Sequence, residues 1–323
     1  MAQLAETREP QAPSAPQDRD LSAWSDALLL GVAAAYAVFI GLLTVVRGVP
    51  LSPDVLAVVA GFAVALALRS RAAFLREWTP FLVLFLAYEL MRGLADDAGL
   101  PVHVADVASL ERVLFAGHLP TAVLQAWLRP TSGPDALAMI GTVAYLLHFV
   151  LPIATGLLLW RGRHRLFHPY LVALILLSFA GFVSYLLLPV APPWMAAQMG
   201  LIGSAPGEAA VVYLKPDAFA GLAGAIGLDG NALYDVAFRS LNANPVAAFP
   251  SLHAAYPFLT FLVLRRAFGR AAGIAAFAYF LLVAVTIVYT ADHYVLDVLG
   301  GVAYATAAYG AMWWLAGRRS LDA

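Results

Sequence analysis

Long apolar stretches recur along most of this sequence, and they constrain its fold more than any other feature. A helix needs roughly 17–25 residues to cross the apolar part of a bilayer. Inside a membrane only helices and closed barrels satisfy every backbone polar group. The sequence therefore predicts an all-α, polytopic membrane protein with about eight transmembrane helices. The eight stretches are residues 25–46, 53–69, 78–95, 134–160, 168–189, 249–267, 271–289 and 292–316.

The composition supports a membrane protein and excludes several kinds of chemistry. Hydrophobic residues make up 62% of the chain and charged residues only 12%, about half the charged share of a soluble domain. A formal net charge of −1 gives no reason to expect nucleic acid as a partner. The absence of cysteine excludes disulfides, thiolate metal ligands and a cysteine nucleophile. Abundant Ala and Arg with little Lys favours a bacterial source, and hence a bacterial plasma membrane.

The chain divides into a tail, an N-terminal pair of helices and a larger core. The tail is rich in Pro, Gln and Ala and is predicted to be a disordered cytoplasmic segment. The core is predicted to hold the last six helices and two outer segments, of which the first contains an interfacial helix at 104–114. The predicted boundaries are 1–20 for the tail, 21–77 for the N-terminal helices, 78–318 for the core, and 96–133 and 190–248 for the outer segments.

Basic residues predict the orientation in the membrane. Arginines cluster at the ends of the apolar stretches on one side of the predicted bundle, and such clusters mark the cytoplasmic side. An even number of crossings then places both termini in the cytoplasm and both outer segments outside. The clustered arginines are Arg69, Arg71, Arg76, Arg161, Arg163, Arg165, Arg265, Arg266, Arg270, Arg318 and Arg319.

Two histidines are predicted to meet at the outer face. His253 follows Pro250, which suits a first helical turn, and His293 lies at the start of the last apolar stretch. The 40 residues between the histidines are filled by two crossings of about 20 residues each, so both return to one face. Asp297 is four residues after His293, a spacing that brings two side chains together on a helix. Two helix N-termini facing one cavity would also form an anion site.

The segments Pro250-Ser251-Leu252-His253 and His293-Tyr-Val-Leu-Asp297 resemble the paired motifs of the type 2 phosphatidic acid phosphatase superfamily, and are most similar to its inositol phosphorylceramide synthase branch. The resemblance implies that His293 attacks phosphorus and forms a phosphohistidine. It further implies that Asp297 orients His293, and that His253 protonates the leaving group and then activates the acceptor. It implies a phospholipid or polyprenyl-phosphate substrate and neither a metal nor another cofactor.

Two cations typical of the phosphatases in that superfamily are absent here. Ile287 stands where an arginine precedes the second histidine, and Ala122 stands where a lysine precedes Arg129-Pro130. This departure favours headgroup transfer, with simple hydrolysis of a lipid or polyprenyl phosphate as the alternative. The candidate substrate-binding residues are Arg92, His148, Ser251, Arg239 and Tyr294.

Two other functional classes are compatible with histidines in a membrane. A haem- or quinone-binding electron carrier would use His253 and His293 as ligands, although haem ligands usually face each other near the middle of helices. A proton-coupled transporter would use them as a relay. Neither class accounts for the paired motifs.

Overall fold

The computed structural model describes the chain over residues 71–92, 99–203, 209–229, 234 and 245–315. Within those ranges every regular element is a helix, as predicted. The tail and the two N-terminal apolar stretches lie outside the described residues. The long helices are α3 (Arg71–Arg92), α6 (Ala136–Gly162), α7 (His164–Leu187), α11 (Leu252–Phe268), α12 (Arg270–Tyr289) and α13 (Val295–Leu315).

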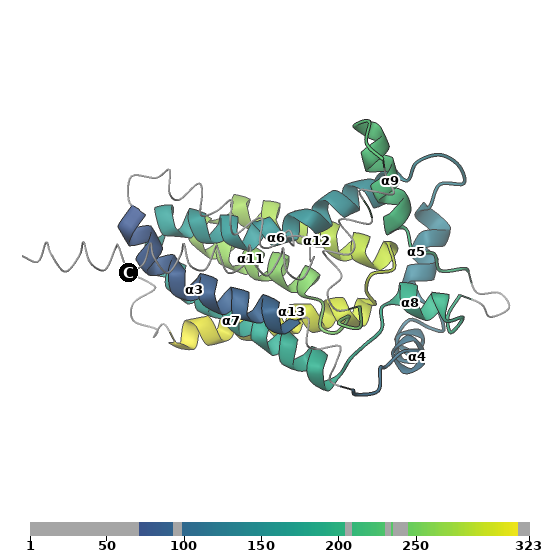
Figure 1. The fold of residues 1–323 in the computed structure, drawn as a ribbon, viewed down its shortest axis with the longest axis horizontal. Coiled ribbons are helices and arrows are strands. Elements are labelled where there is room, and N and C mark those ends of the chain that lie inside the picture. The colour runs from purple at the N-terminus through teal and green to yellow at the C-terminus, as the bar shows by residue number, and fades with distance from the viewer. Residues whose placement is uncertain (1–70, 93–98, 204–208, 230–233, 235–244, 316–323) are drawn as a thin grey trace, which may run out of the picture.

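These six long helices coincide with the six apolar stretches predicted for the core. They run along the long axis of the molecule (Figure 1). Within the described part, the segments His164–Leu187, Arg270–Tyr289 and Val295–Trp314 are long and apolar enough to cross a membrane, and α6 makes a fourth if its two halves count as one span. The total of eight crossings stays a prediction.

Helix α6 is bent, and a proline explains where. Its halves, Ala136–His148 and Val150–Gly162, meet at an angle of 50°. Pro152 lies inside the helix and has no N–H to donate to the carbonyl group of His148, four residues earlier. The bend therefore falls next to His148, whose side chain is buried.

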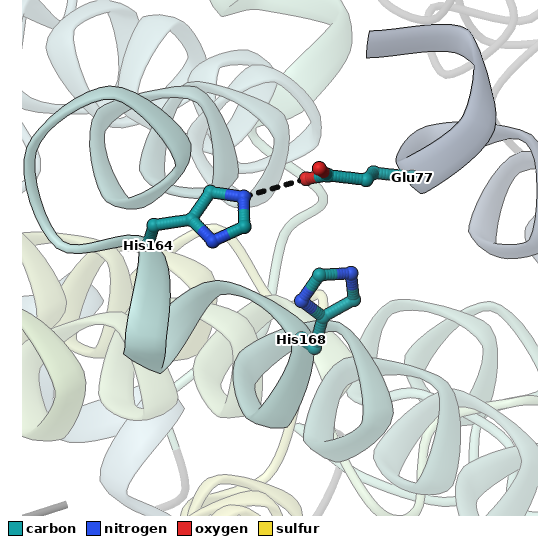
Figure 2. A group of neighbouring side chains, drawn as sticks. All are labelled: Glu77, His164 and His168. Atoms are coloured by element: carbon teal, nitrogen blue, oxygen red, sulfur yellow. Dashed lines mark hydrogen bonds and ion pairs between the residues drawn. The ribbon is translucent and has the colours of Figure 1, made fainter. Parts of the chain in front are cut away.

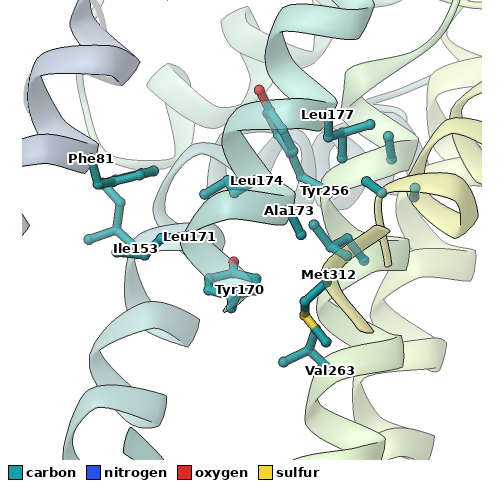
Figure 3. Packing of buried hydrophobic residues seen from close by; sticks show 14 of the residues in the cluster. Phe81, Ile153, Tyr170, Leu171, Ala173, Leu174, Leu177, Tyr256, Val263 and Met312 are labelled. Atoms are coloured by element: carbon teal, nitrogen blue, oxygen red, sulfur yellow. The ribbon is translucent and has the colours of Figure 1, made fainter. Parts of the chain in front are cut away.

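Helix α7 lies at the centre of the largest hydrophobic core. Phe81 of α3 and Ile153 of α6 lie on one side of it, and Val263 and Met312 lie on the other (Figure 3). This packing joins α3 to the helices that carry the two histidine motifs.

Short helices gather at one end of the bundle (Figure 1). They are α4 (Ala105–Leu114), α5 (Pro120–Leu128), α8 (Pro193–Gln198) and α9 (Lys215–Ala225), and α4 confirms the helix predicted at 104–114. Backbone hydrogen bonds join the segments between them, because the N–H of Ala191 donates to His103 and the N–H of Ala248 donates to Val190. The described parts of the two outer segments thus form one cap over the end of the bundle where α11 and α13 begin.

Candidate active site

The first histidine motif forms the start of α11. Ser251 is the N-cap, and its Oγ accepts a hydrogen bond from the N–H of Ala254 at 3.3 Å. Pro250 therefore precedes the helix, and the prediction that it lies in the first turn is wrong. The side chain of Ser251 takes the capping role instead. His253 lies in the first turn, as predicted.

The second motif places His293 just ahead of its helix. Helix α13 begins at Val295, so His293 and Asp297 do not both lie on the helix, as the spacing suggested. They still meet, because the backbone turns there. Nδ1 of His293 lies 3.4 Å from Oδ2 of Asp297, an ion-pair distance without hydrogen-bond geometry.

The two histidines are in direct contact. Nδ1 of His253 lies 2.9 Å from Nε2 of His293, so one of these nitrogens donates a proton and the other accepts it. His293 therefore faces a carboxylate with one nitrogen and a second imidazole with the other. The carboxylate of Asp297 and the two imidazoles can pass a proton between them. Such a transfer can leave one nitrogen of His293 unprotonated, as a nucleophile requires. Contact this close leaves no room for a haem iron between the rings.

Asp297 is fixed by the backbone of both motifs. It is fully buried, and its Oδ2 accepts a hydrogen bond from the N–H of Tyr294 at 2.8 Å. Its carbonyl oxygen accepts another from the N–H of Ser251 at 2.9 Å. Since α11 and α13 are joined at this residue, the two histidines are held in register by main-chain contacts.

Two glycines allow this close contact between α13 and the first motif. A Cβ atom on Gly301 would lie 2.3 Å from the carbonyl oxygen of Ser251, and one on Gly300 would lie 2.5 Å from the ring of Phe249. Both distances are shorter than van der Waals contact. Only glycine at 301 lets the two main chains approach this closely, and glycine at 300 leaves room for the Phe249 ring.

At α13 the expected anion cradle is already occupied, so the expectation is corrected for that helix. Glu111 of α4 accepts hydrogen bonds through Oε1 from the N–H groups of Val295, at 2.6 Å, and Leu296, at 3.3 Å. Burial raises the pKa of the Glu111 carboxyl to about 7. Glu111 therefore takes the anion position at the start of α13, whereas at α11 Ser251 accepts only the N–H of Ala254.

Lys215, at the start of α9, supplies a buried cation beside the histidines. Its Nζ lies 2.8 Å from Oδ1 of Asp292 and 3.2 Å from the ring centroid of Tyr145. The Tyr145 ring stacks on His253 with centroids 4.4 Å apart. Burial lowers the pKa of the Lys215 ammonium, and the adjacent carboxylate of Asp292 opposes this shift.

Sequence reasoning did not select Lys215, although one signal was present. It is the only lysine in the whole sequence. Lysine and arginine together number 19, so the other 18 are arginines. A single lysine in an arginine-rich chain indicates a position where a compact ammonium is required.

The predicted substrate-binding residues have different surroundings. His148 is buried, and its ring centroid lies 4.4 Å from that of His253, so the structure brings it to the site. The ring of Tyr294 packs into the cluster under the cap, with Ala108 and Ala196. The side chain of Arg92 and the whole of Arg239 lie outside the described residues.

Comparison with known proteins identifies the family. The model of the PAP2 superfamily matches residues 105–311, which contain both histidine motifs. This chain belongs to the PAP2 superfamily. It is also 30% identical over 234 residues to the phosphoinositol dihydroceramide synthase of Bacteroides thetaiotaomicron, covering 70% of this chain and 72% of the relative. No solved structure gives a significant match.

Membership in this family confirms the resemblance seen in the two motifs and the choice of branch. Together with the apolar helices, it supports an integral membrane enzyme that acts as a lipid phosphatase or phosphotransferase. The electron-carrier and transporter alternatives gain no support from the family or from the contact between the histidines.

Proposed function

We propose that this PAP2 enzyme transfers a phosphoinositol headgroup from a phospholipid to the hydroxyl group of a ceramide-type lipid. The observation that carries the proposal is the contact of Nε2 of His293 with His253 while Nδ1 faces Asp297. The name of the Bacteroides relative supports the choice of headgroup and acceptor.

The proposed reaction has two balanced steps. In the first, Nε2 of His293 attacks the phosphorus of the donor, an N–P bond forms, and the P–O bond to diacylglycerol breaks. His253 gives its proton to the departing oxygen. In the second, His253 removes the proton of the acceptor hydroxyl, whose oxygen attacks phosphorus and releases His293. Asp297 holds His293 in the required orientation and stabilises its positive charge.

We further propose that Lys215 binds the phosphate during both steps. An ammonium has three donors. Asp292 accepts one of them, and the face of Tyr145, which also stacks on His253, lies under the same group. Tyr145 therefore contacts both this cation and His253, which supports Lys215 as the cation for a phosphate at His293. In a site with little water such a contact stabilises developing negative charge strongly.

The site is proposed to open at the outer membrane face. The positive-inside pattern supports this placement, because the arginine-rich helix ends lie opposite the cap. Both termini would then be cytoplasmic, and the lipid substrates would enter at the level of the headgroups.

Purified full-length protein in vesicles tests headgroup transfer. With inositol-labelled phosphatidylinositol and dihydroceramide, we expect the label to move to a sphingolipid product and unlabelled diacylglycerol to form in equal amount. Without the acceptor, product formation should fall to slow hydrolysis. Release of inositol phosphate at an equal rate with and without acceptor would instead establish a phosphatase. No turnover of any phosphate ester would contradict both reactions.

Replacing Lys215 with methionine is expected to lower kcat/KM by about 10²–10³-fold, the usual effect of removing one transition-state donor. The KM for the donor lipid should rise, and inhibition by inorganic phosphate should weaken. Steady-state kinetics in mixed micelles measure all three quantities.

A double variant separates phosphate binding from a purely structural effect. The change K215M leaves Asp292 buried without its cation, which by itself destabilises the cap. The combined variant Lys215→Met with Asp292→Asn removes both charges. If the double variant regains wild-type kcat/KM, the lysine only neutralises Asp292 and the proposed phosphate contact is wrong. If it stays at the level of K215M, the contact is supported.

A further inference from the structure

Three side chains with metal-binding atoms converge at the opposite end of the bundle from the histidine pair. His164 and His168 lie in the first turns of α7, and Glu77 points toward them from α3 (Figure 2). One ligand atom from each residue lies within 4.8 Å of those of the other two. Nε2 of His164 is 2.7 Å from Oε2 of Glu77.

The residue types and spacing fit a transition-metal ion. Two histidines four residues apart project from one face of a helix, which lets both imidazoles contact a single ion. Two imidazoles and a carboxylate are a known ligand set for Zn²⁺, with the fourth position left for water. Hard cations such as Mg²⁺ prefer oxygen ligands and suit this set poorly.

A fourth residue orients the carboxylate. The indole Nε1–H of Trp160, near the end of α6, donates a hydrogen bond to Oε2 of Glu77 at 2.9 Å. Ligating groups in metal sites are commonly held by such outer contacts. The cluster therefore has three candidate ligands from two helices and an orienting donor from a third.

This cluster is separate from the candidate active site. Tyr185, near the other end of α7, donates a hydrogen bond to the carbonyl group of Pro250 beside the first motif. The 17 residues from His168 to Tyr185 (185 − 168) span about 25 Å at the helical rise per residue. A metal bound at Glu77 and His168 therefore has no direct access to the substrate phosphate.

We propose that Glu77, His164 and His168 bind a Zn²⁺ ion that fastens α3 to α7. Helix α3 precedes the residues matched by the family model, which begin at 105, so the ion would join the first helix of the core to the helices that carry the matched residues. The aromatic contact between Trp78 and Phe167, with centroids 5.0 Å apart, already aligns these two helices beside the cluster. The ion would lie on the arginine-rich side of the bundle.

Metal binding by full-length protein without a polyhistidine tag tests the proposal. After treatment with a chelator, Zn²⁺ should bind at one equivalent, raise the midpoint of thermal unfolding, and remain after dialysis. Co²⁺ should bind in its place and give the visible absorption bands of a site with nitrogen and oxygen ligands. Mg²⁺ should produce no shift.

Variants locate the ion. His168→Ala should abolish the retained metal and the thermal shift, and Trp160→Phe should weaken binding by about 10–100-fold through loss of the outer contact. His118→Ala, which removes an exposed imidazole from the cap, should behave as wild type. Because His168 is exposed, its loss leaves the core intact. Failure of wild type to retain Zn²⁺, or retention unchanged by His168→Ala, would overturn the proposal.

Discussion

Replacing His293 with alanine is expected to lower the rate of headgroup transfer by roughly 10⁴-fold or more, the range seen when a covalent nucleophile is removed. Nε2 of its imidazole contacts the partner histidine, and Nδ1 faces the buried carboxylate. Burst and steady-state kinetics with the labelled donor measure this loss, and the phosphoenzyme trapped by acid-free quenching should vanish with it.

The variant His118→Ala provides the matched control for this experiment. It removes an imidazole that is exposed on the cap and should retain full activity. Both variants should elute as the wild type does on size exclusion. A His293→Ala enzyme that keeps its turnover, or that still carries label on histidine, would show that the nucleophile has been assigned to the wrong residue.

The variant Asp297→Asn is expected to reduce turnover by about 10³–10⁴-fold, as when the carboxylate behind a catalytic histidine is neutralised in other enzymes. The amide has nearly the same shape, and its oxygen can still accept the hydrogen bond of Tyr294. That oxygen takes the position of Oδ2, which also faces Nδ1 of His293 at 3.4 Å. The variant therefore keeps the geometry of the site but loses the negative charge that stabilises the positive charge on His293 during the attack.

A surface pair controls for the general effect of removing a carboxylate beside a histidine. Asp106 contacts His103 on the exposed face of the cap, so Asp106→Asn should leave turnover unchanged. The pH profile adds a second readout, because Asp297→Asn should shift its acidic limb as the charge next to His293 is lost. Near-normal turnover of Asp297→Asn at every pH would show that the carboxylate only supports the fold.

Much of the fold and the centre of the site could be predicted because they depend on local patterns. Apolar stretches of membrane-spanning length locate the six long helices of the core, and the distance of two crossings between His253 and His293 brings the two rings to one face. Helix starts were less predictable. The N-cap at Ser251 and the turn ahead of Val295 depend on backbone contacts between α11 and α13.

The proposed phosphate partner, Lys215, could not be predicted because its place in the site depends on contacts between distant parts of the chain. Lys215 meets Asp292 across 77 residues, and Glu111 reaches the start of α13 across 184 residues. No helical period or motif spacing encodes these pairs. Glu111 changes the chemistry of the site most, since it satisfies the N–H groups at the start of α13 that seemed available to phosphate.

The absence of a side chain at Gly301 affects how the lipid specificity of this enzyme can change. The two histidine motifs are held together where the main chain at Gly301 packs against the main chain at Ser251. Residues on the outward faces of the helices, such as Leu299, are exposed and take no part in that contact. The lipids that the enzyme accepts can therefore change through substitutions on those faces while the reaction centre stays as it is. A single added methyl group at residue 301 would disturb the reaction for every lipid alike.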